Sequence, residues 1–190
     1  MLEVNGDLWA FHARGFHVVV TTNAGWDMSP NWAPPACLTL AQESGPACWN
    51  NMGAGSVLQA WRKHPSLSEW YGRRCRAHAR GSLAEPLTMA RPVMPVLKRD
   101  DLRLVFLPVK PVVWSAPQLS WDQQADLLYI QAGLQQIRSW QATLGAPKLA
   151  MTLPGAGNGS LDPREVRALV LRELGHTGIT LVDRQLRVVR

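Results

Sequence analysis

The alternation of short β-branched segments with amphipathic helices constrains the fold of this chain more than any other feature. The run 16–22 is rich in valine and threonine and predicts a buried strand, whereas apolar residues recur at helical spacing across 120–145. Strands that alternate with helices favour a mostly parallel sheet covered on both faces. We therefore expect an α/β fold with three α/β/α layers around a mixed, mostly parallel central sheet.

The remaining elements can be placed by their composition and by their capping residues. Besides 16–22, we expect strands at 1–5, 92–97, 102–109, 148–153, 178–182 and 185–189. We expect helices from Gly55 to about Pro65, from Ser66 to Gly81, from Ser120 to Gly145 and from Asp162 to Gly175. Ser66 with Glu69, and Ser120 with Gln123, have the spacing of a capping box.

The segment 24–50 breaks both periodicities because it is rich in glycine, proline and tryptophan. A chain of 190 residues fits a single domain, 1–190, that carries this segment as an insertion. Its tryptophans, Trp26, Trp32 and Trp49, have flat faces that can stack on a base or sugar. We prefer the alternative that they pack the insertion onto the domain, since tryptophan usually dominates local core contacts.

Charge and cysteine content restrict the partners. Twenty Lys and Arg against fourteen Asp and Glu give a net charge of +6, which favours nucleic acid or pyrophosphate ligands, although a basic surface also simply solubilises a protein. Three cysteines without a Cys-x-x-Cys pair argue against a disulfide framework or a zinc site, and His64, His78 and His176 lack metal-ligand spacing. No apolar membrane span or signal peptide is recognisable. We expect a cytoplasmic monomer without a metal or a membrane partner.

Two glycine-rich turns each precede a predicted helix: Met52–Ser56 and Pro154–Leu161. Glycine lets backbone amides approach a ligand closely, and a helix N-terminus adds partial positive charge, so such turns can bind anions. The second turn directly follows the strand 148–153, at the carboxyl end where open α/β sheets bind ligands. One such turn is more often only a tight turn, but two together favour a diphosphate ligand. Neither is a Walker A loop or a Rossmann fingerprint.

The order of these motifs resembles the macrodomain family. The motifs are Gly6-Asp7-Leu8 after the first strand, Asn23 at the end of the second, Met52-Gly53-Ala54-Gly55, Leu107-Pro108-Val109-Lys110 and Leu153-Pro154-Gly155-Ala156-Gly157. The chain is most similar to the branch that contains the human terminal ADP-ribose glycohydrolase and the DNA-repairing macrodomain of the bacterial DarT–DarG toxin–antitoxin pair. The resemblance runs nearly end to end, interrupted by the insertion. It implies a macrodomain with ADP-ribose as ligand and no further cofactor.

The resemblance also implies ligand contacts. Asp7, followed by Leu8, corresponds to the residue that recognises the adenine amino group, which a carboxylate can do by accepting a hydrogen bond; a role as turn or cap residue is the alternative. The first loop would contact the diphosphate and distal ribose through Gly53, Ala54, Gly55 and Ser56. The second would wrap the diphosphate through Pro154, Gly155, Ala156, Gly157, Asn158 and Gly159. The aromatic residue that covers adenine in many members is replaced near Val182.

The catalytic residues implied by the resemblance are Lys110 and Asn23. Lys110 ends an apolar strand and is followed by Pro111, so we expect it to project at the carboxyl edge of the sheet. In this branch the matching lysine works at the anomeric carbon of the distal ribose, and a lysine whose pKa is lowered by burial can act as nucleophile or general acid. A passive counter-ion to the diphosphate is the alternative. Asn23 corresponds to the family asparagine near that ribose.

The implied function is hydrolysis of the glycosidic bond that links ADP-ribose to modified DNA or to an acidic protein side chain. The human enzyme has an aspartate in the second loop at the position of Gly159, whereas the bacterial antitoxin macrodomain has glycine there, which favours the DNA-acting relatives. A non-catalytic reader of ADP-ribose and a phosphatase acting on ADP-ribose 1″-phosphate remain alternatives, since a fold does not fix a function.

Overall fold

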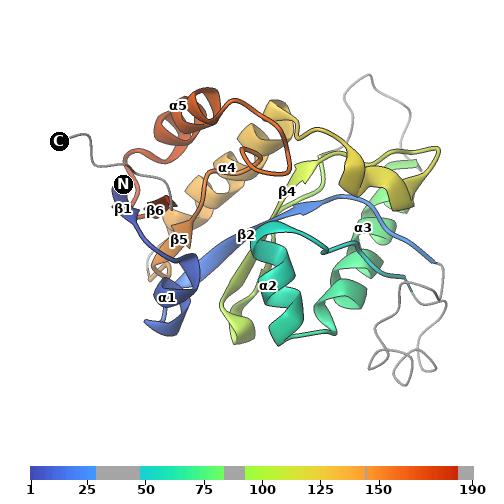
Figure 1. Ribbon diagram of the computed structural model, residues 1–190, viewed down its shortest axis with the longest axis horizontal. Coiled ribbons are helices and arrows are strands. Elements are labelled where there is room, and N and C mark those ends of the chain that lie inside the picture. Colours follow the sequence, from blue (N-terminus) through green and yellow to red (C-terminus); the bar gives the residue numbers. More distant parts are fainter. Residues whose placement is uncertain (29–47, 84–92, 144, 184–190) are drawn as a thin grey trace.

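A computed structural model describes residues 1–28, 48–83, 93–143 and 145–183 (Figure 1). In chain order the elements are β1 (Leu2–Asn5), α1 (Leu8–Ala13), β2 (His17–Asn23), α2 (Gly55–Lys63), α3 (Leu67–Leu83), β3 (Leu97–Arg99), η3 (Asp100–Leu102), β4 (Leu104–Lys110), η4 (Pro117–Asp122), α4 (Leu127–Gln141), β5 (Leu149–Met151), α5 (Pro163–Leu174) and β6 (Thr180–Asp183). Within these residues no helix is both long and apolar enough to cross a membrane.

The described strands form one six-stranded sheet in the order β1-β6-β5-β2-β4-β3. Neighbouring strands pair in parallel, except that β3 runs antiparallel to β4. The predicted mixed, mostly parallel sheet is thereby confirmed. Since β1, β2, β4, β5 and β6 all run in one direction, their carboxyl ends reach the same edge of the sheet, and the segments that follow them gather there.

Alternate residues of the central strands belong to two separate apolar cores. In β2, Val18 and Val20 pack with residues of α1, α2 and α3, whereas Val19 packs with residues of α4 and α5. Figure 1 shows these two groups of helices on opposite faces of the sheet. A strand buried on both faces appears in a sequence as a continuous apolar run, as it does at 16–22. The three-layer α/β/α architecture is confirmed.

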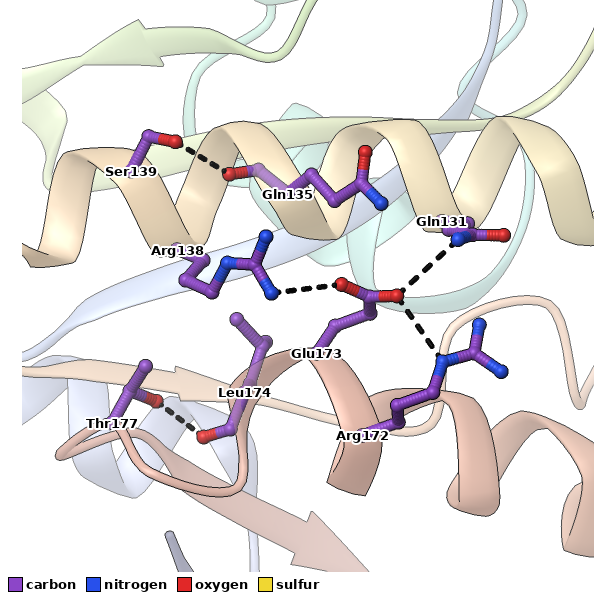
Figure 2. Close-up of polar contacts among 8 residues, drawn as sticks. All are labelled: Gln131, Gln135, Arg138, Ser139, Arg172, Glu173, Leu174 and Thr177. Carbon is purple, nitrogen blue, oxygen red and sulfur yellow. Dashed lines mark hydrogen bonds and ion pairs between the residues drawn. The ribbon is translucent and has the colours of Figure 1, made fainter.

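A buried carboxylate joins α4 and α5, the two helices that cover one face of the sheet. Glu173 of α5 is 6% exposed. It accepts hydrogen bonds from Gln131 Nε2 (3.3 Å) and Arg138 Nη1 (3.2 Å) of α4 and from the neighbouring Arg172 Nε (3.3 Å) (Figure 2). Burying a carboxylate is costly unless donors replace its water, and these side chains supply them. They fix α5 against α4.

The predicted start of the long helix at Ser120 is wrong. α4 begins at Leu127, because the Asp126 carboxylate caps it by accepting hydrogen bonds from the amides of Leu128 and Tyr129. Residues 117–122 instead form η4, in which the Ser120 hydroxyl donates to the Pro117 carbonyl.

The first long helix also differs from the prediction. α3 begins after Ser66, as predicted, but it continues through Gly81, because a helical glycine costs only about 1 kcal/mol relative to alanine. The Glu69 carboxylate accepts hydrogen bonds from Arg73, at 2.6 and 3.0 Å, one turn later. The side chain of Glu69 is therefore engaged within the helix.

The strand predicted at 92–97 is instead found at Leu97–Arg99. The chain turns back through η3, and Arg103 takes a left-handed conformation with φ of 51° just before β4. The helix α1 was not predicted, since its 6 residues are too few for a periodic pattern. The strand predicted at 185–189 lies outside the described residues.

The two ends of the insertion lie side by side. Asp27 and Trp49 exchange two backbone hydrogen bonds, of 2.7 and 2.8 Å, as an isolated antiparallel bridge. Trp49 is 3% exposed, and Trp26 is partly buried against the apolar core between the sheet and the helices α1, α2 and α3. The prediction that tryptophans pack the insertion onto the domain is confirmed for these two. Trp32, like the rest of 29–47, lies outside the described residues.

Candidate functional site

Asn23 and Lys110 end adjacent strands of the sheet. Asn23 is the last residue of β2 and pairs with Lys110, the last residue of β4, after a shift in register that follows Thr22. The Ala24 amide donates to the Lys110 carbonyl at 2.9 Å, which fixes the pair. Lys110 therefore lies at the carboxyl edge, as predicted.

The amine of Lys110 is held between two loops. Its Nζ donates to the carbonyl oxygens of Trp121, at 2.7 Å, and Asn158, at 2.9 Å. Burial lowers the pKa of Lys110 below its ordinary value, and the nearby Asp122 carboxylate partly opposes this effect. Lys110 thus loses its proton more readily than a solvated lysine, which a nucleophile or a proton-transfer group requires.

The Asn23 side chain organises the backbone around it. Its Oδ1 accepts hydrogen bonds from the Gly25 amide (2.9 Å) and from Asn50 Nδ2 (3.0 Å), and its Nδ2 donates to the Asn51 carbonyl (2.9 Å). Asn23 is 5% exposed, so these bonds are shielded from water. The geometry makes Asn23 a residue that fixes the first glycine loop; the catalytic role suggested for it remains a prediction.

The first glycine loop lies against β2 at the start of α2. The Thr21 amide donates to Ser56 Oγ at 3.3 Å, and the Gly53 amide donates to Asn51 Oδ1 at 3.0 Å. Gly55 opens α2 with φ of +65°, a conformation that favours glycine, and a side chain added there would meet no atom within 4 Å. Gly53, Ala54 and Gly55 are exposed. The loop therefore presents the N-terminus of a 9-residue helix to solvent, as an anion site needs.

The glycines of the second loop differ in how closely the protein packs around them. At Gly159 an added Cβ would lie 2.4 Å from the Gly155 carbonyl oxygen and 2.6 Å from Ala125, so close packing within the protein requires glycine. Gly155 likewise combines φ of +77° with contacts to Ala125 and Ile130. At Gly157, by contrast, an added Cβ would meet no atom within 4 Å.

The outer part of this loop is available to a ligand. Gly157 and Asn158 are exposed and Ala156 is half-buried, whereas Pro154 and Gly155 are buried. The hydrogen bonds of the loop use the carbonyl oxygens of Gly155, Gly157, Asn158 and Gly159. Among the described residues, the backbone N–H groups of 155–159 donate no hydrogen bond. These donors are therefore available to bind an anion.

Asp7 and Leu8 follow β1 at the same edge of the sheet. Asp7 is exposed and caps α1, its Oδ1 accepting a hydrogen bond from the Trp9 amide at 3.3 Å, so the role as cap residue is confirmed. Its role in adenine recognition remains a prediction. Leu8 is 3% exposed and packs in the core, which leaves only its backbone for a ligand. Val182 is 1% exposed and also belongs to the core.

A small cavity of about 40 Å³ opens beside Asn23. It lies between the end of β2, the segment before α2, and η4. Its lining is made by Asn23, Gly25, Trp26, Asp27, Trp49, Asn50, Asn51, Met52, Gly53, Trp61, Ser68, Pro117 and Gln118. Within the described parts of the chain, the lining carries indole faces, amide groups and the Asp27 carboxylate but no lysine or arginine.

Asn50 is the functional candidate that the sequence did not reveal. It is 2% exposed, and its Nδ2 donates to the carbonyls of Asn23 and Gly25 as well as to Asn23 Oδ1. Its Oδ1, and the indole nitrogens of Trp49 and Trp61, are buried without a hydrogen-bond partner among the described residues. The pair Asn50-Asn51 directly before a glycine turn was the available signal, but asparagine is common in turns for conformational reasons.

The described cysteines do not compete with Lys110 as nucleophiles. Cys48 and Cys75 are buried and unpaired. Burial raises the pKa of the Cys48 thiol to about 11 and also raises that of Cys75, so both are poor thiolate sources near neutral pH. In the part of the chain that the structure describes, no three His, Cys, Asp or Glu side chains gather in a way that could hold a metal ion.

No family model matches the chain, and no curated protein matches it significantly. The macrodomain of Mycobacterium tuberculosis DarG is 19% identical with a TM-score of 0.59, and the match covers 95% of each chain. The macrodomain of Thermus aquaticus DarG is 19% identical with a TM-score of 0.56, again over 95% of each chain.

A third structure, Thermosipho africanus DarTG in complex with ADP-ribose, is 17% identical with a TM-score of 0.59. That match covers 95% of this chain but 40% of the other, so this chain spans less than half of the DarTG protein. Together with the sheet order and the two covering layers, these similarities show that the chain has the macrodomain fold and resembles the macrodomains of DarG.

Proposed function

We propose that this protein binds ADP-ribose at the carboxyl edge of its sheet and hydrolyses the glycosidic bond between the distal ribose and a modified DNA base. One observation carries the proposal: a continuous chain of contacts joins the two glycine loops through Asn23 and Lys110. Asn23 bonds to Asn51 beside the first loop, Asn23 pairs with Lys110, and Lys110 bonds to Asn158 in the second loop.

This arrangement suits a diphosphate with a sugar attached. Backbone amides at the start of α2 and in the second loop are suited to bind phosphate oxygens, since both present donors and neither requires a metal. Asp7, at the end of β1, accepts a hydrogen bond from the adenine amino group in this proposal. The similarity to a DarTG structure solved in complex with ADP-ribose supports the same ligand.

Lys110 supplies the chemistry. In its neutral form the amine adds to the anomeric carbon as the bond to the base breaks, and the proton that the resulting ammonium group loses passes to the departing base. Water then breaks the new carbon–nitrogen bond, which releases ADP-ribose and regenerates the lysine. The lowered pKa of Lys110 increases the neutral fraction near neutral pH, and the loops orient the ribose toward it.

The cavity beside Asn23 supports a DNA base over an acidic side chain as the group that carries ADP-ribose. Its volume of about 40 Å³ is below that of a base, but the partly exposed indoles of Trp26 and Trp61 in its lining offer flat faces against which the edge of a neutral ring can pack. Among the described residues its lining includes the Asp27 carboxylate and no lysine or arginine, so a carboxylate leaving group would meet a like charge there without a compensating positive one. The buried free thiols of Cys48 and Cys75 suit a reducing compartment such as the cytoplasm.

The direct test mixes the purified protein with an ADP-ribosylated DNA oligonucleotide and, separately, with an ADP-ribosylated glutamate peptide. We expect release of ADP-ribose from the DNA, and a loss of at least about 100-fold in Lys110→Ala, the scale expected for a proton-transfer or nucleophilic group. Lys148→Ala is the matched control, because Lys148 is exposed at the opposite edge, just before β5.

Other outcomes distinguish the alternatives. Tight binding of ADP-ribose by calorimetry without release from either substrate would identify a non-catalytic reader. Release of phosphate from ADP-ribose 1″-phosphate alone would identify a phosphatase. Release from the DNA that is equal in Lys110→Ala and in the unaltered protein would exclude Lys110 as the catalytic residue.

A further inference from the structure

A basic patch covers the amino edge of the sheet, opposite the candidate site. The turn between β3 and β4, the end of α1 and the connection from α2 to α3 all lie along this edge (Figure 1). The cationic side chains of the patch are Arg14, Lys63, Arg74, Arg99 and Arg103, and the histidines His12 and His64 lie among them.

Direct contacts hold the elements of the patch together. The guanidinium groups of Arg74 and Arg99 lie 4.2 and 5.4 Å from the centre of the Trp70 ring, although one belongs to α3 and the other to β3. His12 of α1 contacts the Leu102 carbonyl of η3 at 2.9 Å. The cations are therefore brought together by the fold and not by adjacency in sequence.

A second indole is covered in the same way. The Lys63 amine lies 4.3 Å from the centre of the Trp9 ring, and the His12 ring lies 5.3 Å from that ring. Each indole face that carries a cation is closed to a nucleobase. The patch therefore offers fixed positive charges rather than stacking surfaces.

The charges of the patch are close enough to repel one another. Burial lowers the pKa of Arg74, and the neighbouring Arg99 lowers it further. Burial also lowers the pKa of His64, with further contributions from His12, Lys63 and Arg99. Asp101 pairs with Arg99 and Asp100 with His17, which neutralises only part of the charge. Cations held together against their repulsion favour a polyanion as partner.

We propose that this patch is a second interaction surface, which binds the phosphate backbone of nucleic acid without reading its sequence. Phosphates match fixed guanidinium groups in charge and geometry. Because the aromatic rings are covered, affinity comes from release of counterions and depends steeply on salt. The patch includes none of the residues proposed to bind ADP-ribose, so in this proposal it anchors a nucleic acid strand independently of the hydrolysis.

The test measures binding of an unmodified single-stranded DNA 20-mer, which carries no ADP-ribose, by fluorescence anisotropy at several salt concentrations. The double variant Lys63→Gln with Arg74→Gln removes two exposed cations and keeps part of each side-chain stem on its indole. We expect the slope of log affinity against log salt to fall by about 1.4, that is about 0.7 for each lost contact. Arg80→Gln with Arg164→Gln, two exposed arginines outside the patch in the last turn of α3 and the first turn of α5, is the control of equal charge, and we expect little change.

If the salt slope of DNA binding falls equally in the two double variants, only net charge matters and the proposal is overturned. The absence of DNA binding at 50 mM salt in the unaltered protein would also overturn it. Poly-glutamate of matched charge is the comparison ligand. If it binds as tightly as the DNA, and if the variant Lys63→Gln with Arg74→Gln weakens that binding, nucleic acid is overturned as the partner. Hydrolysis of a small ADP-ribosylated substrate should be equal in both double variants, so failure here is distinguishable from failure of the proposed function.

Discussion

Lys110 Nζ lies 2.9 Å from the carbonyl oxygen of Asn158, so the last side chain of β4 is tied to the tip of the second glycine loop. The same amine bonds to Trp121 in η4. A ligand that moves either loop therefore changes the surroundings of this amine, and the amine in turn restrains the loops. Lys110 is both the candidate reactive group and a structural link across the site.

The pH dependence of Lys110 can be tested through Asp122, whose carboxylate raises the pKa of Lys110 against the larger effect of burial. Asp122→Asn removes that opposition, so the pKa of Lys110 falls further. If the neutral amine is the nucleophile, we expect the rising limb of kcat against pH to shift to lower pH in Asp122→Asn. An unchanged limb in a full pH profile would mean that another group controls it.

The same shift has a consequence for stability, with the same sign as that of a paired carboxylate, because folding lowers the pKa of both groups. The folded-state pKa of Lys110 is lower than its unfolded value, so between the two the unfolded chain binds more protons. Stability should therefore rise as pH increases through this window, and Lys110→Met should weaken the rise. Urea denaturation of both proteins at several alkaline pH values measures it.

The glycines of the second loop should differ sharply in tolerance. We expect Gly159→Ala to destabilise the protein by about 1–3 kcal/mol, since overpacking forces the surrounding backbone to shift, and to displace the loop from Lys110. Gly157→Ala should be nearly neutral for stability, because space is open there. Thermal unfolding of the two variants gives the comparison; similar losses in both would contradict the packing that distinguishes them.

The two roles of Asp7 can be separated by choice of substitution. Asp7→Ser keeps a capping oxygen for α1, whereas Asp7→Ala loses it at a cost of about 1 kcal/mol. Both variants lack a carboxylate, so both should bind ADP-ribose at least about tenfold more weakly if Asp7 contacts adenine through a charged hydrogen bond. Calorimetry and thermal unfolding read the two effects independently. Full affinity in Asp7→Ser would leave Asp7 with its capping role alone.

Glu173 should matter for stability and not for the site. Glu173→Ala removes an acceptor that Gln131, Arg138 and Arg172 share, and we expect a loss of about 2–3 kcal/mol in denaturant unfolding. Glu165→Ala, on the exposed first turn of the same helix, should cost at most about 1 kcal/mol. Affinity for ADP-ribose should be unchanged in both variants.

The sequence predicted the architecture well, because burial on both faces leaves a strong pattern in strands such as 16–22 and 102–109. It also placed Lys110 at the correct edge, since a strand end followed by proline is a local signal. Boundaries set by capping were less predictable: Ser120 and Asp126 both carry capping oxygens, and only the fold selects Asp126. Asn50 was missed because its three acceptor groups come from residues more than 20 positions away.

The pairing of β1 with β6 has a consequence for how the site is assembled. Leu2 aligns with Thr180 and Asn5 with Asp183, so the strand that precedes Asp7 pairs with a strand 178 residues later in the sequence. During synthesis the ribosome must deliver β6 before this strand can dock. The adenine end of the proposed ligand site is thus completed only after both glycine loops, which precede β6 in the sequence, have been synthesised.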